Sequence, residues 1–114
     1  LENIKKYNLN VITPSDIIDS GIKSVSKTIL DTIKENTYVS FDMDCLDPAF
    51  APGVSVPVPL GVNSIDAMYC VKNLVQRGII GFDLMEICPP HDLNNITSHL
   101  ASRMIGELIS SCKV

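Results

Sequence analysis

Apolar residues recur at helical spacing in three parts of the chain and gather in short strand-like runs in three others. Apolar positions three and four residues apart predict helices over 22–33, 64–77 and 96–112. Short runs rich in strand-forming residues predict strands over 10–13, 38–41 and 79–85. The order is therefore strand, helix, strand, helix, strand, helix. This alternation favours a parallel sheet covered by helices, with right-handed crossovers.

Polar residues and glycines mark the expected element ends. Pro14 closes the first strand, and Ser15 is predicted to cap a short helical turn after it. Asn63 or Ser64 is predicted to cap the second long helix, and Gly78 stands just past its end.

The segment between the second strand and the second long helix is rich in proline. Four of the seven prolines fall within residues 48–59, and Gly53 and Gly61 lie in or beside this segment. Proline at this density prevents a regular helix and holds each preceding residue in an extended conformation. A long stiff loop is expected, and long ordered loops in compact domains are usually functional.

Two carboxylates follow the second strand. Residues two apart in a strand share a face, so Asp42 and Asp44 are expected to converge. Two close negative charges need a shared proton, a cationic side chain or a metal. No Lys or Arg occurs between Lys34 and Lys72, which favours a cation such as Mg²⁺, Mn²⁺ or Ca²⁺. An acidic turn with Asp44 and Asp47 as solvated caps remains the alternative.

The third predicted strand also ends in a carboxylate. Glu86 should reach the same sheet edge as Asp42 and Asp44, because parallel strands end together. Asp83 lies inside the apolar strand and points to the face opposite Glu86. A charge there requires a partner, so Asp83 is expected to be a supporting or structural group.

Composition narrows the classes of protein. With 114 residues, of which 46% are hydrophobic and 19% charged, the chain fits one packed domain. No apolar run approaches the ~18–20 residues of a membrane helix. The net charge is −4 and basic residues are scattered, so neither a membrane nor a nucleic acid is an expected partner.

The four cysteines fit a reducing compartment. No Cys-x-x-Cys pair and no secretory segment is visible, so free thiols and a cytoplasmic location are expected. Cys45 and Cys88 each follow a candidate site carboxylate. Neither has a neighbouring base that would lower its pKa, so both are interpreted as packing residues.

Both histidines favour structural interpretations. His91 beside Asp92 could act in acid–base chemistry, but a loop histidine next to an aspartate that caps the last helix is preferred. His99 and Arg103, four residues apart, are interpreted as an exposed helix pair.

Residues 40–53 resemble a known signature. The run Ser-Phe-Asp-Met-Asp-Cys-Leu-Asp-Pro-Ala-Phe-Ala-Pro-Gly is similar to the third signature of the arginase/agmatinase (ureohydrolase) family. Residues 83–92, Asp-Leu-Met-Glu-Ile-Cys-Pro-Pro-His-Asp, resemble the family's Asp-(aliphatic)-x-Glu-x-x-Pro-x-x-Asp segment, and residues 96–101 continue it. Details such as Cys45 favour agmatinase over arginase.

The resemblance implies a fold and a chemistry. The fold would be the C-terminal part of a three-layer α/β/α, arginase/deacetylase-like domain with a parallel sheet, formed by residues 1–114 as a single segment. The activity would be hydrolysis of an agmatine-like guanidino compound to amine plus urea, in polyamine biosynthesis, with two Mn(II) ions per complete site. Asp42 would bridge both ions, Asp44 would bind one, and Glu86 would hold the guanidinium; no catalytic residue beyond the metal ligands is implied.

The departures from the family pattern matter equally. The family's upstream Gly-Gly-x-His and Asp-Ala-His-x-Asp ligand segments do not occur in these 114 residues. The site is therefore incomplete here, and the segment alone is expected to be inactive, working as part of a larger enzyme. Where the family has Thr-Gly-Thr-Pro-x-x-Gly-Gly, residues 54–61 read Val-Ser-Val-Pro-Val-Pro-Leu-Gly. The alternative is a truncated, non-catalytic paralogue that serves as an assembly or interaction module.

The resemblance also bears on partners. Three parallel strands offer little core, and the sheet edge that would continue into the missing part is a template for association. A homo-oligomer or a complementary N-terminal segment is expected to cover it.

Overall fold

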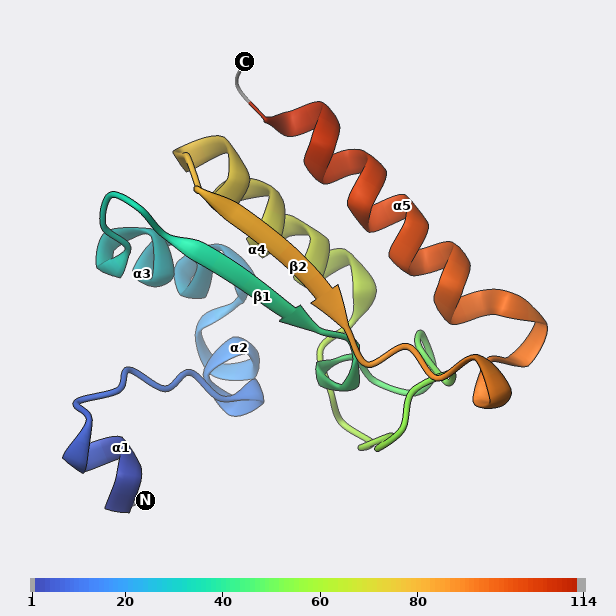
Figure 1. The fold of residues 1–114 in the computed structure, drawn as a ribbon. Helices are drawn as coiled ribbons and strands as arrows, with labels where there is room; N and C mark the ends of the chain where they lie inside the picture. The colour runs from blue at the N-terminus through green and yellow to red at the C-terminus, as the bar shows by residue number, and fades with distance from the viewer. Residues whose placement is uncertain (1, 113–114) are drawn as a thin grey trace.

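A computed structural model describes residues 2–112 and shows two parallel strands backed by three long helices (Figure 1). The strands are β1 (Tyr38–Asp42) and β2 (Gly81–Met85). The helices α3 (Ile22–Thr32), α4 (Ser64–Arg77) and α5 (Ile96–Ser111) lie side by side, with α4 in the middle. The expected mixed α/β architecture with parallel strands is confirmed.

The first predicted strand, over residues 10–13, is absent, whereas the short helix expected after it is present. Residues 9–13 form no strand, because no other segment of residues 2–112 pairs with them. Two short helices flank this stretch, α1 (Glu2–Lys6) and α2 (Pro14–Ser20). Thr13, not Ser15, is the N-cap residue of α2, and its backbone N–H and its hydroxyl donate to Asp16 Oδ2 at 2.6 and 2.7 Å.

The two faces of the sheet differ in cover. The register pairs Tyr38 with Gly81 at one end and Asp42 with Met85 at the other. Phe41, with Phe82 and Leu84 of β2, faces the helices and joins the core. The opposite face carries Tyr38, Ser40, Asp83 and Met85 and is not covered by any helix among the described residues. The described residues thus form a two-stranded sheet with one layer of helices.

The proline-rich segment is part of the core. Met43, Leu46, Ala51 and Val54 are fully buried, although all four lie between β1 and α4 in loops and turns. They pack against the apolar stripes of the helices, which include Ala67, Val71, Val75, Ala101, Met104 and Leu108. Burial of its apolar positions fixes the loop in place.

Both ends of α4 follow the predicted chemistry. Asn63 caps α4 by accepting a hydrogen bond from the Asp66 N–H at 2.8 Å, and Gly78 ends the helix with φ +109°.

His99 is exposed as expected, but Arg103 pairs with Glu107 at 2.8 Å and not with His99. Glu107 also meets Lys72 of α4 at 3.3 Å, so this carboxylate joins the two helices. No helix of residues 2–112 has the length and apolar character to cross a membrane.

Candidate active site

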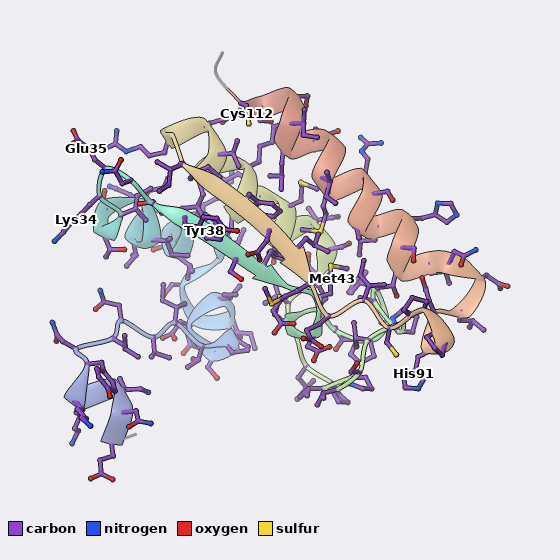
Figure 2. All side chains as sticks on the ribbon, viewed as in Figure 1. Lys34, Glu35, Tyr38, Met43, His91 and Cys112 are labelled. Atoms are coloured by element: carbon purple, nitrogen blue, oxygen red, sulfur yellow. The ribbon has the colours of Figure 1, made fainter. Side chains whose placement is uncertain are left out.

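The carboxyl end of β1 carries an aspartate that shapes the turn after it. Asp42 is the last residue of the strand, and its Oδ1 accepts the Asp44 N–H at 2.8 Å. This bond starts the 3₁₀ turn Met43–Cys45, which the buried Met43 anchors in the core (Figure 2). Asp44 therefore lies in this turn and does not continue the strand. This differs from the prediction, which placed Asp42 and Asp44 on one face of an extended strand. The two carboxylates are close because the chain turns between them. The side chain of Asp42 accepts the Asp44 N–H and so offers the backbone an alternative to strand hydrogen bonds.

Asp44 presents an unsatisfied oxygen. Its Oδ1 is buried and has no hydrogen-bond partner within the described part of the chain. A buried carboxylate oxygen without a donor is costly, and a bound cation would satisfy it. Asp42 remains exposed beside it. This donor set fits part of a site for a carboxylate-loving metal ion.

Glu86 stands at the same edge in a strained conformation. It directly follows β2, whose last residue Met85 pairs with Asp42, so the two strand ends deliver Asp42 and Glu86 to one edge of the sheet. Glu86 is exposed and has φ +67°, a left-handed conformation that costs a non-glycine residue about 1–2 kcal/mol. Such strain persists where the surroundings impose it, and it clusters at functional positions.

The ligand set is incomplete within the chain. Among residues 2–112, no three His, Cys, Asp or Glu side chains gather closely enough to hold a metal ion. Asp42 and Asp44 could supply carboxylate oxygens, but a metal would need further donors from elsewhere.

Asp47, the third carboxylate of the 40–48 run, organises the proline-rich loop. Its Oδ1 accepts the Ala49 N–H and its Oδ2 accepts the Leu60 N–H, each at 2.8 Å. Its own N–H donates to the Val62 carbonyl at 3.0 Å. Asp47 thus closes both ends of the loop. Sequence reasoning named it only as a solvated cap and missed this role, although an Asp before Pro is a turn signal.

A second set of bonds fastens the loop to the segment after Glu86. The Gly53 carbonyl accepts the Cys88 N–H at 2.8 Å, and Val54 forms an antiparallel bridge with Ile87. The Gly53 N–H donates to the hydroxyl of the fully buried Thr97 at 2.7 Å. These contacts hold the backbone that directly follows Glu86, a role of Thr97 that the sequence did not predict.

Asp92 caps α5, as expected. It accepts the Thr97 N–H at 2.8 Å, the Ser98 N–H at 2.9 Å and the Ser98 hydroxyl at 2.6 Å. Partial desolvation alone would raise the pKa of Asp92, but the hydrogen bonds from Ser98 and Thr97 outweigh it and hold the pKa below the usual 3.8. His91 beside it lies with Nδ1 3.2 Å from the Val54 carbonyl, on the turn before α5 (Figure 2).

The lowered pKa of Asp92 makes the stability of the chain depend on pH. A carboxyl with a lower pKa in the folded state stabilises the fold above its unfolded pKa, near 3.8, and loses this effect as the pH falls through its folded value. We expect the Asp92→Asn variant to be less stable than wild type at pH 6 and to approach it below pH ~3. Guanidinium chloride unfolding at a series of pH values measures this; a constant difference across the series would contradict it.

Asp83 has the partners that its place in a strand required. Its Oδ2 accepts the Tyr38 hydroxyl at 2.7 Å and its Oδ1 accepts the Ser40 hydroxyl at 2.8 Å. The hydrogen bond to Asp83 raises the pKa of Tyr38. These bonds tie β1 to β2 on the uncovered face and make Asp83 a structural group.

The cysteine in the turn is not activated. Desolvation, together with the negative charges of Asp42 and Asp44, raises the pKa of the Cys45 thiol to about 11. The thiol is therefore protonated at neutral pH. Cys45 is nevertheless exposed and Cys88 is half-buried, so the interpretation of both as packing residues is not confirmed. All four cysteines are free.

The molecule is thus an α/β protein with an acidic site at the carboxyl edge of its sheet. Carboxylates stand at the ends of two adjacent parallel strands, and the turn after β1 holds the buried, unsatisfied Asp44 oxygen. The profile of the arginase family matches residues 1–110, and the chain belongs to this family. An agmatinase from Chromobacterium violaceum is 35% identical over 102 residues, covering 89% of this chain. Among solved structures, the proclavaminate amidino hydrolase from Streptomyces clavuligerus matches with a TM-score of 0.90 and 32% identity over 97% of the chain. The arginase from Bacillus subtilis matches with a TM-score of 0.87 and 29% identity over 94%.

The match covers only part of each relative. The chain spans 32% of the C. violaceum agmatinase, 38% of the S. clavuligerus hydrolase and 39% of the B. subtilis arginase.

Proposed function

We propose that this chain forms one part of a Mn(II)-dependent ureohydrolase that cleaves an agmatine-like guanidino compound to an amine and urea. The observation that supports the proposal most strongly is the common sheet edge of Asp42 and Glu86, together with the unsatisfied Oδ1 of Asp44 in the turn that follows Asp42. Similarity to an agmatinase and to an amidino hydrolase favours a guanidino substrate.

Each carboxylate has a proposed role. Asp42 and Asp44 would provide oxygen ligands for two Mn(II) ions, completed by donors outside residues 1–114. Mn(II), when bound, lowers the pKa of a water molecule and polarises the carbon that this water attacks. Glu86 would accept two parallel hydrogen bonds from the planar guanidinium and orient its carbon toward the metal ligands. The exposed, strained position of Glu86 at the strand end suits a side chain that projects toward a ligand.

Hydrogen bonds near Glu86 support its proposed role. The hydrogen bonds that Gly53 makes with Cys88 and Thr97 fix the backbone after Glu86. They would therefore restrict the positions that the Glu86 carboxylate can adopt. We also propose a cytoplasmic location, supported by the four free thiols.

The chain alone is expected to release no urea from agmatine, arginine or related guanidines, because two carboxylates cannot complete the four to six ligands that each ion would take. The test mixes the 114-residue chain with the portion of the C. violaceum agmatinase outside the matched 102 residues. In the presence of Mn²⁺, the mixture should release urea.

Two controls make this test decisive. Asp42→Asn removes a ligand charge, and the mixture containing it should lose about a hundredfold or more of the activity. Urea release by the chain alone that Asp42→Asn abolishes would show that the site is complete within these residues. A mixture that assembles but releases no urea would exclude the catalytic role.

A second candidate function is a non-catalytic assembly module. The proline-rich loop favours it, because Val56 and Leu60 are 60 and 85% exposed where the family pattern has a threonine and a glycine. Exposed apolar side chains in a stiff loop are typical of interaction surfaces. Assembly without urea release is the outcome that would favour this function.

A further inference from the structure

Ser55 carries the only polar side chain of the proline-rich segment. Residues 48–62 otherwise hold prolines, glycines and apolar side chains. The family pattern has glycine at this position, so the hydroxyl is a feature of this chain and not of the shared pattern. Ser55 is exposed, whereas Val54 before it is fully buried. A buried neighbour therefore anchors the backbone directly beside an accessible hydroxyl.

Backbone pairing fixes where Ser55 stands. Val54 forms an antiparallel bridge with Ile87, and the Cys88 N–H donates to the carbonyl of the residue before Val54 at 2.8 Å. In an antiparallel pair, one step forward on one segment is one step back on the other, so the next pair sets Ser55 opposite Glu86. Figure 1 shows the proline-rich loop running beside the segment that follows β2.

The side chains of this pair are both accessible. Residues directly opposite each other in an antiparallel pair share a face, with their Cβ atoms about 4.5–5.5 Å apart. Ser55 and Glu86 are exposed, and neither takes part in the side-chain hydrogen bonds and ion pairs found within residues 2–112. The register therefore places a hydroxyl next to a carboxylate, with both available to one ligand.

A guanidinium offers more donors than Glu86 can accept. A carboxylate takes two parallel N–H bonds from the planar cation, and further N–H groups on the same cation remain without an acceptor. We propose that the hydroxyl oxygen of Ser55 accepts one of these N–H groups, so that Ser55 and Glu86 bind the guanidino substrate together. The inference rests on the proposed function, since it takes Glu86 to bind a guanidinium.

The test compares two substitutions at Ser55 with one at Val58. Ser55→Ala removes the hydroxyl and Ser55→Thr keeps it, whereas Val58→Ala trims another exposed side chain of the same loop. Because both positions are exposed, all three variants should keep the thermal unfolding midpoint of wild type. Urea release from agmatine is measured with Mn²⁺ and the portion of the C. violaceum agmatinase outside the matched 102 residues. In the chain alone, NMR should detect a nuclear Overhauser effect between the side-chain protons of Ser55 and Glu86.

Ser55→Ala should raise the KM for agmatine about tenfold and change kcat by less than about twofold, because the lost hydrogen bond binds the ground state and the transition state alike. Ser55→Thr and Val58→Ala should keep the wild-type KM. An unchanged KM in Ser55→Ala beside an active wild type would overturn this inference alone, as would the absence of the Ser55–Glu86 nuclear Overhauser effect. A fall in kcat at constant KM would also overturn it, since the hydroxyl would then act on the chemical step. No urea release by the wild-type mixture would contradict the proposed function itself, and this inference with it.

Discussion

Replacing Gly61 with alanine is expected to lower the free energy of unfolding by about 1–3 kcal/mol. A Cβ atom there would lie 2.6 Å from the Asp47 nitrogen, 2.7 Å from the Leu46 carbonyl carbon and 2.8 Å from the Cys45 carbonyl oxygen. All three are backbone atoms of the turn that follows Asp42, so no side chain can rotate away to make room. The loop would have to move, and the bonds that Asp47 makes to Leu60 and Val62 would break.

Gly106 provides the matched control. It lies inside α5, and a Cβ built there meets nothing within 4 Å. Alanine at this position should stabilise the chain by about 0.5–1 kcal/mol, since glycine loses more conformational freedom on folding. Guanidinium chloride unfolding of both variants measures the difference. A Gly61→Ala variant as stable as wild type would show that the turn after Asp42 is pliable, against its burial of Met43 and Leu46.

The helices could be predicted from the sequence because their signals are local. Each long helix carries its own apolar stripe, and α4 carries its own cap and terminator in Asn63 and Gly78. A strand depends on a second segment, and this is why residues 10–13 were misassigned. The strand-forming residues Val11, Ile12 and Thr13 are present, yet no partner strand lies beside them in residues 2–112.

The candidate site was predictable in its place but not in its detail. Parallel strands end at one edge, so the positions of Asp42 and Glu86 followed from the order of elements. Asp44 lies in a turn in which the Asp42 side chain accepts the Asp44 N–H. The free energy of one such hydrogen bond is small, so the sequence does not show whether the turn or the continued strand is favoured. The glycines of the proline-rich segment were visible, but the chain segments that approach them come from residues 45–47 and 92 and are set by the tertiary fold.

Replacing Glu86 with asparagine is expected to raise stability and abolish activity. Asparagine adopts a positive φ more readily than glutamate, so relief of the φ +67° conformation should stabilise the chain by about 0.5–1 kcal/mol. The shorter amide cannot accept two charge-assisted hydrogen bonds from a guanidinium. In the mixture with the C. violaceum portion, urea release should fall about a hundredfold or more.

Leu60 allows the two effects to be separated. It has φ +68° and is 85% exposed, so Leu60→Asn should relieve a similar strain and give a similar gain in stability. Its side chain has no proposed role in substrate binding, and urea release by the mixture should therefore stay near the wild-type rate. Equal activity of the Glu86→Asn and wild-type mixtures would remove Glu86 from the substrate site. A loss of stability in Glu86→Asn would instead show that the glutamate side chain itself stabilises the left-handed conformation of the backbone. The positive φ of Glu86 would then not be a strain that the fold imposes on a substrate-binding residue.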